Sequence, residues 1–410
     1  MNLQLRCPQC GVILPTMKGT GILTCACSRY PQIDDVPTIK TSASASEEIE
    51  TAGQAIEVGG RVGAMEWIRK WCDSNQCSLD ALTRVVIDVP LQYKGTFIED
   101  WQRYGMVGME DYFILRWACP SFLCNLALLP IFAGKRMLDL GCGVGHLAHQ
   151  ASLLSPPAEV VAADGILLHN LVLRKYFAPE TPCICLDMED HLPFPEQSFD
   201  LVILNDCFHY VTGKKKLLKE IFRILNNEGL VALVHVHDPR NLSGERVPGE
   251  PLEPNECVKL IREAEANAVI SLSSERVFLK KYFQGNEIGL MDIVSDQPHL
   301  EPGPYLVFAS KTDDLFLKDQ RSLAVLQPYK LEQLILNSVY QVSSSNDGFT
   351  FSLQWPNMIV FEEFGRELYL PQEVRVRQDI GSEQLAHLRR MGILIPDPRG
   401  TLGQSLTGNR

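Results

Sequence analysis

The central part of the chain alternates short apolar runs with polar turns and amphipathic segments, which is the pattern of an α/β fold. The apolar runs are rich in Val, Ile, Leu and Ala, as expected for parallel strands that are buried on both faces. Residues 214–225 carry an apolar stripe opposite a lysine-rich face, which predicts an amphipathic surface helix. The runs predicted as strands are residues 137–140, 160–163, 183–186, 199–204 and 230–236.

A glycine-rich turn directly follows the first of these strands. Gly141, Gly143 and Gly145 occupy every second position, and Asp139 stands two residues before the first of them. A helical pattern begins at His146, so the segment predicts a strand, a tight turn and a helix. This arrangement lets a ligand contact bare backbone at the open edge of a parallel sheet, and its spacing differs from the G-x-G-x-x-G of dinucleotide-binding enzymes. A tight turn between two packed elements is the alternative interpretation.

Polar residues follow the next strands at positions that suit a nucleoside. Asp164 ends the second apolar run, 25 residues after Asp139, near the spacing at which an acid reaches ribose hydroxyls. A carboxylate suits a vicinal diol because it accepts two hydrogen bonds. Asp187 and Asn205 follow the next two strands at the same edge of the sheet. A solvated turn residue is the alternative for either acid taken alone.

Together these segments resemble the class I S-adenosylmethionine (SAM)-dependent methyltransferases of the type that acts on small molecules. The family has an acid before three alternating glycines, an acid after the second strand, and a Leu-Pro-Phe turn before a Phe-Asp pair, which here are residues 192–194 and 199–200. The resemblance covers about residues 131–312. It implies a Rossmann-like sheet of seven strands, closed by an antiparallel pair at residues 269–279 and 305–310, with a helix near residues 256–267.

The resemblance also implies roles in SAM binding. The three glycines would approach the methionine part, and Asp164 would bind the ribose. Asp187 would hold the adenine amino group, with Met188 against the ring, while Asp139 would orient the glycine loop and the amino group of the ligand. The candidate cofactor-binding residues are Asp139, Gly141, Gly143, Gly145, Asp164, Asp187, Met188 and Asn205.

Candidate acceptor-side residues lie just beyond the fourth and fifth strands. Methyl transfer from a sulfonium needs mainly the positioning of the acceptor, and a general base only where the acceptor loses a proton. His209 is the candidate catalytic base because an unperturbed imidazole titrates near neutrality, and a role in shaping the pocket is the alternative. Tyr210, His235 and His237 are candidate substrate-pocket residues. The last two histidines with Asp238 suggest a metal site, but the sequence shows no further ligand, and substrate contact or simple packing is the alternative.

The N-terminal segment contains four cysteines with the spacing of a metal site. Cys7 and Cys10 form a C-P-x-C-G knuckle, and Cys25 and Cys27 follow after a short interval. This segment resembles the zinc-ribbon modules that are attached to, or partnered with, many methyltransferases, and it predicts a structural zinc held by four thiolates. The second pair is C-x-C where the family has C-x-x-C. A metal-free β-ribbon is therefore the alternative.

The sequence predicts five parts. They are residues 1–40 as the zinc-ribbon-like module, 41–60 as a flexible linker, 61–130 as a helical lid region, 131–312 as the SAM-binding domain and 313–410 as a small α+β appendage. Tyr104, Tyr112, Phe113 and Trp117 either line an acceptor pocket under the lid or belong to the core. In the appendage, residues 349–355 and 358–364 predict strands, and 382–390 predict a helix with Ser382 as its N-cap.

Composition favours a soluble cytoplasmic enzyme. Of the 410 residues 45% are hydrophobic, yet no apolar run reaches the ~18 residues that span a bilayer, and the first residues lack the pattern of a signal peptide. Thirteen cysteines, an odd number spread along the chain, favour reduced thiols. The net charge of −12 argues against a long polyanion as substrate.

Three functions are consistent with these features. The leading one is a SAM-dependent methyltransferase that acts on a small-molecule or carrier-bound biosynthetic intermediate. An RNA methyltransferase that docks its substrate through the zinc ribbon is an alternative, against which the acidic charge counts. A non-catalytic scaffold is another, against which the intact glycine loop and both acids count. The C-terminal part is open to a role in homodimerisation, in docking a protein partner or in capturing the substrate.

Overall fold

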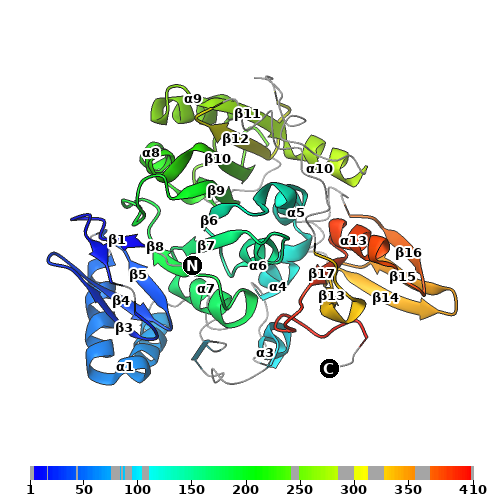
Figure 1. Ribbon diagram of the computed structural model, residues 1–410, viewed down its shortest axis with the longest axis horizontal. Coiled ribbons are helices and arrows are strands. Elements are labelled where there is room, and N and C mark those ends of the chain that lie inside the picture. Colours follow the sequence, from blue (N-terminus) through cyan, green and yellow to red (C-terminus); the bar gives the residue numbers. More distant parts are fainter. Residues whose placement is uncertain are drawn as a thin grey trace.

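The computed structural model describes residues 4–15, 17–42, 45–74, 84, 86–87, 95–103, 110–241, 249–284, 300–312, 327–355 and 370–407. Within these ranges a ten-stranded sheet runs through the molecule, with helices on both of its faces (Figure 1). The N-terminal elements, drawn in blue, extend one end of this sheet. The C-terminal elements, drawn in orange and red, lie on the other side of the central helices.

Seven of the strands form the central part of the sheet, in the order β8-β7-β6-β9-β10-β12-β11. Neighbours are parallel except at β12, which is antiparallel to both β10 and β11. The expected Rossmann-like sheet with its closing antiparallel pair is thereby confirmed. The strands are β6 Arg136–Leu140, β7 Glu159–Asp164, β8 Cys183–Leu186, β9 Phe199–Asn205, β10 Leu225–Val236, β11 Val269–Ser274 and β12 Tyr305–Ser310.

Helices cover both faces of this central sheet. Successive strand residues alternate between the two layers, so that Met137 packs in one hydrophobic cluster and Leu138 in the other. Helices α5, α6, α7 and α10 share the first cluster, and α8 and α9 share the second. Their bounds are α5 Pro120–Phe132, α6 His146–Ser152, α7 Leu167–Val172, α8 Lys214–Ile224, α9 Pro254–Ala264 and α10 Glu275–Phe283.

Two elements of this region differ from the sequence prediction. β11 ends at Ser274, and helix α10 begins at the next residue, whereas the sequence predicts a strand to Leu279. Phe278, Leu279 and Tyr282 are buried at helical spacing, and α10 packs against α5, so tertiary packing decides for a helix. β10 begins at Leu225, five residues earlier than predicted, with an irregular register to β9 before Leu230.

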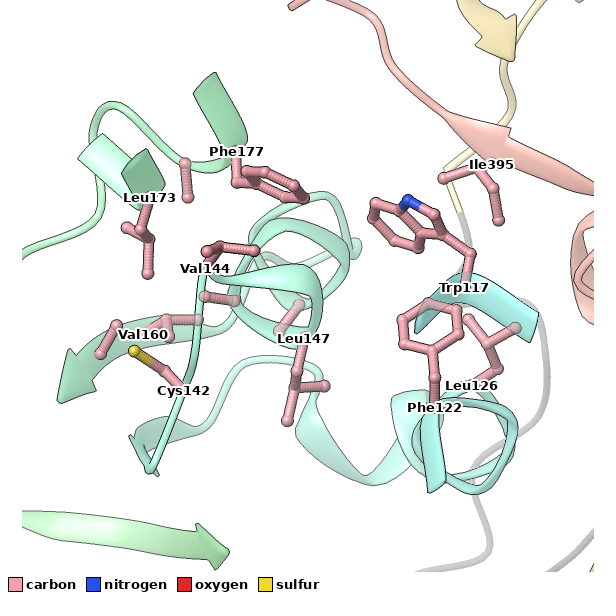
Figure 2. Close-up of a cluster of buried hydrophobic side chains, with 14 of the residues drawn as sticks. Trp117, Phe122, Leu126, Cys142, Val144, Leu147, Val160, Leu173, Phe177 and Ile395 are labelled. Carbon is pink, nitrogen blue, oxygen red and sulfur yellow. The ribbon is translucent and has the colours of Figure 1, made fainter. Parts of the chain in front are cut away.

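Aromatic residues that precede the first strand belong to the core. Trp117 lies in a short 3₁₀ turn and packs edge-on against Phe122, with ring centroids 4.9 Å apart. Figure 2 shows both rings facing Leu147 and Phe177, inside the first hydrophobic cluster. Phe113 is also buried there. Trp117 and Phe113 therefore belong to the core, which is the second of the two interpretations that the sequence allows.

The predicted lid region contains two further helices. These are α3 Phe97–Arg103 and α4 Glu110–Leu115. Phe97 stacks on Trp101 and is buried against the first cluster. Tyr104 and the side chain of Tyr112, two of the candidate pocket residues, lie outside the described residues. None of the described helices is long and apolar enough to cross a membrane.

The N-terminal segment extends the sheet instead of forming a separate module. After the hairpin of β1 Leu5–Arg6 and β2 Ile13–Leu14, strands β3 Gly21–Thr24, β4 Arg29–Ile33 and β5 Val36–Ile39 form an antiparallel meander. β5 then pairs in parallel with β8, the edge strand of the central sheet. Thr38 lies opposite Cys185, and Ile39 lies opposite Leu186.

Much of the predicted flexible linker is helical, which corrects the expectation for residues 41–60. Helix α1 Ser46–Ser74 begins inside this segment and packs on β3 and β4, with a break at Gly60, where φ is +54°. Arg61 forms an ion pair with Asp34 at 2.8 Å, and Arg29 pairs with Glu57. Small polar residues predict flexibility from composition alone, but Ala52 and Ile56 supply the buried contacts that hold a helix here.

The C-terminal part is a small α+β unit that packs against α5 and α6. Its helix α13 Ser382–Arg390 has the predicted bounds, although Gly381 and not Ser382 takes the N-cap position. Both ring nitrogens of His149 in α6 lie within hydrogen-bond distance of carbonyl oxygens, those of Phe177 and Pro396. The predicted strand at 358–364 lies outside the described residues. The strands are β13 Leu334–Leu336, β14 Tyr340–Ser345, β15 Gly348–Leu353, β16 Glu373–Arg377 and β17 Leu394–Pro396.

The junction between β5 and β8 gives a test of this architecture. Ile39 is 1% exposed at that junction, so Ile39→Ala should lower the free energy of unfolding by about 2–4 kcal/mol. We expect urea unfolding, followed by circular dichroism, to shift as one cooperative transition, while Val58→Ala, at a side chain that is 92% exposed, leaves it unchanged. Two separate transitions, of which only one shifts, would show that the N-terminal strands fold independently.

Candidate active site

The glycine loop after β6 has a backbone that only glycine adopts easily. The φ angles of Gly141, Gly143 and Gly145 are +83°, +53° and +95°. A Cβ at Gly141 would lie 2.5 Å from the sulfur of Cys207, and one at Gly145 would lie 2.5 Å from Leu173. A Cβ at Gly143 would meet no atom within 4 Å. The middle of the loop is thus the part where a ligand can approach the backbone.

Asp164 connects this loop to the end of β7. Its Oδ2 accepts a hydrogen bond from the backbone N–H of Gly143 at 2.9 Å, and its Oδ1 accepts one from Ile166 at 2.8 Å. His169 Nδ1 lies 3.1 Å from the same Oδ1. Burial alone would raise the pKa of Asp164, but His169 and these N–H groups outweigh it and lower the pKa. The carboxylate is therefore charged at neutral pH.

Asp139 is buried beneath the glycine loop. Its side chain is 1% exposed, and its Oδ2 has no hydrogen-bond partner among the described residues. Burial, and then the nearby charge of Asp164, raise the pKa of Asp139 to about 7. A buried carboxylate oxygen without a donor is costly, so this position favours a ligand that supplies a cation or an N–H group.

A cavity of about 360 Å³ opens beside the ends of β7 and β8. One side of it is formed by Gly165 and Ile166 after β7, and by Asp187 and Met188 after β8. The exposed ring of Tyr210 forms part of the wall. A further part of the wall comes from the N-terminal segment, which the sequence did not indicate. Its lining residues are Lys40, Ser42, Ala45 and Glu48.

A cluster of charged side chains lies beyond the ends of β9 and β10. Asp206 Oδ2 accepts a hydrogen bond from Arg116 at 2.8 Å, and its Oδ1 accepts one from His237 Nε2 at 3.0 Å. Although burial raises the pKa of Asp206, Arg116 and the histidines hold it well below its usual range. His235 donates to Glu275 at 2.6 Å. Burial lowers the pKa of His235, but Glu275 and Asp206 outweigh it and raise the pKa to about 9.

His209 lies next to this cluster, in the 3₁₀ turn Phe208–Tyr210. Its ring is 4.5 Å from that of His237, and its Nδ1 has no hydrogen-bond partner among the described residues. Burial, and then the neighbouring His237, lower the pKa of His209 to about 4. The expected titration near neutrality is therefore wrong, because the sequence could not show this burial. The imidazole is neutral at pH 7.

Asn205 and Asp238, two other residues considered from the sequence, differ in their hydrogen-bond partners. Asn205 ends β9 opposite Val234, and its Oδ1 has no partner among the described residues. Asp238 does not join the histidines, because Arg240 takes both of its carboxylate oxygens, the closest contact being 2.7 Å. A metal site that includes Asp238, which the sequence left open, is thereby excluded in this arrangement.

Comparisons with known proteins identify the central region. The family model described as a methyltransferase domain matches residues 138–233, which include the glycine loop, Asp164, β8, β9 and most of β10. The chain contains a class I SAM-dependent methyltransferase domain. The match ends before α9, and the remaining elements of the seven-stranded sheet continue the same domain.

Curated methyltransferases are similar to part of this chain. A malonyl-[acyl-carrier protein] O-methyltransferase of Legionella pneumophila is 31% identical over 99 residues, which are 24% of this chain and 34% of the relative. A norajmaline N-methyltransferase of Rauvolfia serpentina is 31% identical over 158 residues, or 36% of this chain and 50% of the relative. This chain thus spans half or less of these two relatives.

A solved structure also resembles this chain. It is a SAM-dependent methyltransferase of Thermotoga maritima, which is 14% identical and covers 53% of this chain and 97% of its own, with a TM-score of 0.34.

The four N-terminal cysteines lie together at the tip of the β1–β2 hairpin and the β3–β4 turn. The sulfurs of Cys7 and Cys27 are 3.5 Å apart, those of Cys25 and Cys27 are 3.4 Å apart, and those of Cys10 and Cys25 are 3.8 Å apart. All four sulfurs lie within 4.8 Å of one another. The C-x-C pair thus brings both of its sulfurs to the cluster despite its unusual spacing.

On the acceptor side, sequence reasoning assigned no role to Arg116, Glu275 or Asp206. Arg116 and Glu275 reach the acceptor side of the methyltransferase domain from distant parts of the chain, so no local pattern indicates them. Asp206 directly follows Asn205 at the end of β9, and its position after a strand was a usable signal. Its backbone has a φ of +54°, and that of His235 has a φ of +58°, which is unusual for residues other than glycine.

The raised pKa of Asp139 predicts a pH-dependent stability of the ligand-free protein. The folded pKa of about 7 lies above the unfolded value of roughly 3.9. Stability from this group is therefore complete below about pH 4 and is lost as pH rises through 7. Asp139→Asn removes the charge and should raise the free energy of unfolding at pH 8 by about 1–3 kcal/mol, with little change at pH 4.

Urea unfolding at both pH values, with Asp347→Asn as an exposed control, measures this difference. Equal effects of Asp139→Asn at pH 4 and pH 8 would contradict it.

Proposed function

We propose that this chain transfers the methyl group of SAM to a small-molecule or carrier-bound acceptor. The observation that carries the proposal is the convergence of the open glycine loop, the charged Asp164 and the cavity at one edge of the sheet. Ligands of open α/β sheets bind at this carboxyl edge. The two curated relatives support the acceptor class, since one is named for malonyl on an acyl-carrier protein and the other for the alkaloid norajmaline.

The residues present fit SAM. The unpaired Oδ2 of Asp139 lies beneath the loop, where it suits the ammonium group of the ligand. Asp164 would bind the ribose with the lone pairs that its backbone donors leave free. Asp187 and Met188, which line the cavity, would hold the adenine. Gly143 lets the methionine part approach the backbone, and Asn205 offers an unpaired Oδ1 at the end of β9.

SAM supplies a methyl group that is already activated, so the chain has to orient the acceptor in line with it. We assign the acceptor side to Tyr210, His235 and His237, at the ends of β9 and β10. His209 is the proposed catalytic residue, because its free Nδ1 can accept a hydrogen bond from the acceptor. Arg116 and Asp206 hold His237 in place through the hydrogen bonds described above.

The role of Asp164 can be tested by calorimetry with SAM. Asp164→Asn keeps the shape of the side chain but removes its charge, so we expect SAM to bind at least about tenfold more weakly, or about 1.4 kcal/mol. Asp379→Asn, an exposed substitution in the C-terminal part, should leave the affinity unchanged. Equal affinity in folded Asp164→Asn would remove Asp164 from the ribose site, and absence of SAM binding in the wild-type protein would refute the proposed function.

We also propose that the cysteine cluster holds one structural zinc ion. A tetrahedral zinc with Zn–S bonds of about 2.3 Å places its sulfurs about 3.8 Å apart, close to the observed separations of 3.4–3.8 Å. Four thiolates leave no position for a reacting molecule, so this zinc would stabilise the fold.

Metal analysis tests the zinc site. Protein dialysed against metal-free buffer should retain about one zinc per chain, and the double variant Cys7→Ser/Cys10→Ser should lose it. Cys257→Ser, which changes a buried cysteine of α9, serves as the control and should retain the metal. A wild-type protein without zinc, or a double variant with the same zinc content, would support the metal-free β-ribbon.

A further inference from the structure

The acceptor side of the methyltransferase domain contains three donor atoms that converge on one point. Asp206, His235 and His237 each offer one such atom, and the three atoms lie within 4.8 Å of one another; the Nε2 atoms of both rings face Oδ1 of Asp206. His237 Nε2 is 3.0 Å from Oδ1, and His235 Nε2 is 3.9 Å from the same oxygen. Two imidazoles and one carboxylate on one face are the donor set of open transition-metal sites.

Glu275 and Arg116 hold the donor residues by hydrogen bonds, as the residues around a metal centre commonly do. The other ring nitrogen of His235 donates to Glu275 at 2.6 Å, which fixes the ring so that Nε2 points at the convergence point. The other carboxylate oxygen of Asp206 is held by Arg116 at 2.8 Å, which leaves Oδ1 for the metal. Asp206 and His235 also keep left-handed backbone conformations, a strain that tends to occur at functional sites.

Charge and access are also compatible with a cation. Asp206 and Glu275 both place a carboxylate against the histidine rings, at 3.0 Å from His237 and 2.6 Å from His235, so a cation that replaces a ring proton meets oxygen atoms at once. The side chains of Asp206, His235 and His237 are 15%, 15% and 20% exposed, so the point where they converge can be reached from solvent. No fourth protein ligand joins the group among the described residues, which leaves positions for an outside molecule.

We propose that Asp206, His235 and His237 bind a divalent first-row transition-metal ion whose open positions take an oxygen atom of the methyl acceptor. Such an ion orients a bound hydroxyl or carboxylate and makes a hydroxyl easier to deprotonate. The site lies at the ends of β9 and β10, beside the loop that we propose binds SAM. The role toward the acceptor thus rests on the proposed function, whereas binding of the metal itself does not.

Cobalt titration of the full chain tests the site. The protein is first loaded with one equivalent of zinc per chain, which the four thiolates take first, and Co²⁺ alone is then added. We expect one further Co²⁺ per chain, with visible absorption but without the intense thiolate-to-cobalt bands that cysteine ligands would give. Absence of this Co²⁺, or its appearance with thiolate bands, would overturn the proposal.

Variants then assign the ligands. His237→Gln and Asp206→Asn should each weaken Co²⁺ binding by about tenfold or more, and Glu275→Gln should weaken it by roughly tenfold through His235. His209→Gln, at the neighbouring histidine that is not a ligand, should stay close to the wild type. Affinities unchanged in both His237→Gln and Asp206→Asn would overturn the assignment, and far-ultraviolet circular dichroism identifies any variant that fails to fold.

SAM calorimetry on the same samples separates this proposal from the proposed function. SAM binding without added Co²⁺ binding would overturn the metal site and leave the methyltransferase proposal standing. Co²⁺ binding without SAM binding would overturn the methyltransferase proposal and leave the metal site standing.

Discussion

The carboxylate of Asp164 is the interaction on which the rest of the site depends. It ties the glycine loop after β6 to the turn after β7 through two backbone N–H groups. Cys142 and Val144 of the loop are buried in the first hydrophobic cluster, and the hydrogen bond to Asp164 fixes the backbone of Gly143 between them. His169 lowers the pKa of this carboxyl group, so the residue that holds the loop also carries a fixed negative charge, directly before Gly165 in the wall of the cavity.

The sequence predicted the parts of the site that are local in the chain. Gly141 to Gly145, Asp164 and Asp187 follow strand ends, and the order of elements alone brings them to one edge of the sheet. The acceptor side was harder to predict, because Arg116 and Glu275 join Asp206 only through tertiary packing. The titration of His209 was predicted wrongly for the same reason, since its pKa depends on burial. The linker was predicted wrongly because composition does not show which face finds a partner.

The N-terminal segment and the methyltransferase domain form one structural unit. β5 pairs with β8, α1 packs on β3 and β4, and Lys40 and Glu48 line the same cavity as Asp187. The cysteine cluster lies at the tip of the strands that lead into β5, so a metal bound there would order the segment that forms this wall. The C-terminal unit meets the methyltransferase domain elsewhere, for example where His149 of α6 lies within hydrogen-bond distance of the carbonyl oxygen of Pro396.

Pairing with β5 also changes what β8 exposes. β8 is the outermost strand of the seven-stranded sheet, and all four of its residues are buried. Without β5, its backbone N–H and C=O groups would form an unpaired, apolar edge, which is a template for pairing with other chains. A fragment that begins at the methyltransferase domain would therefore be prone to aggregation, and the twisted meander of β3 to β5 protects the sheet from self-association.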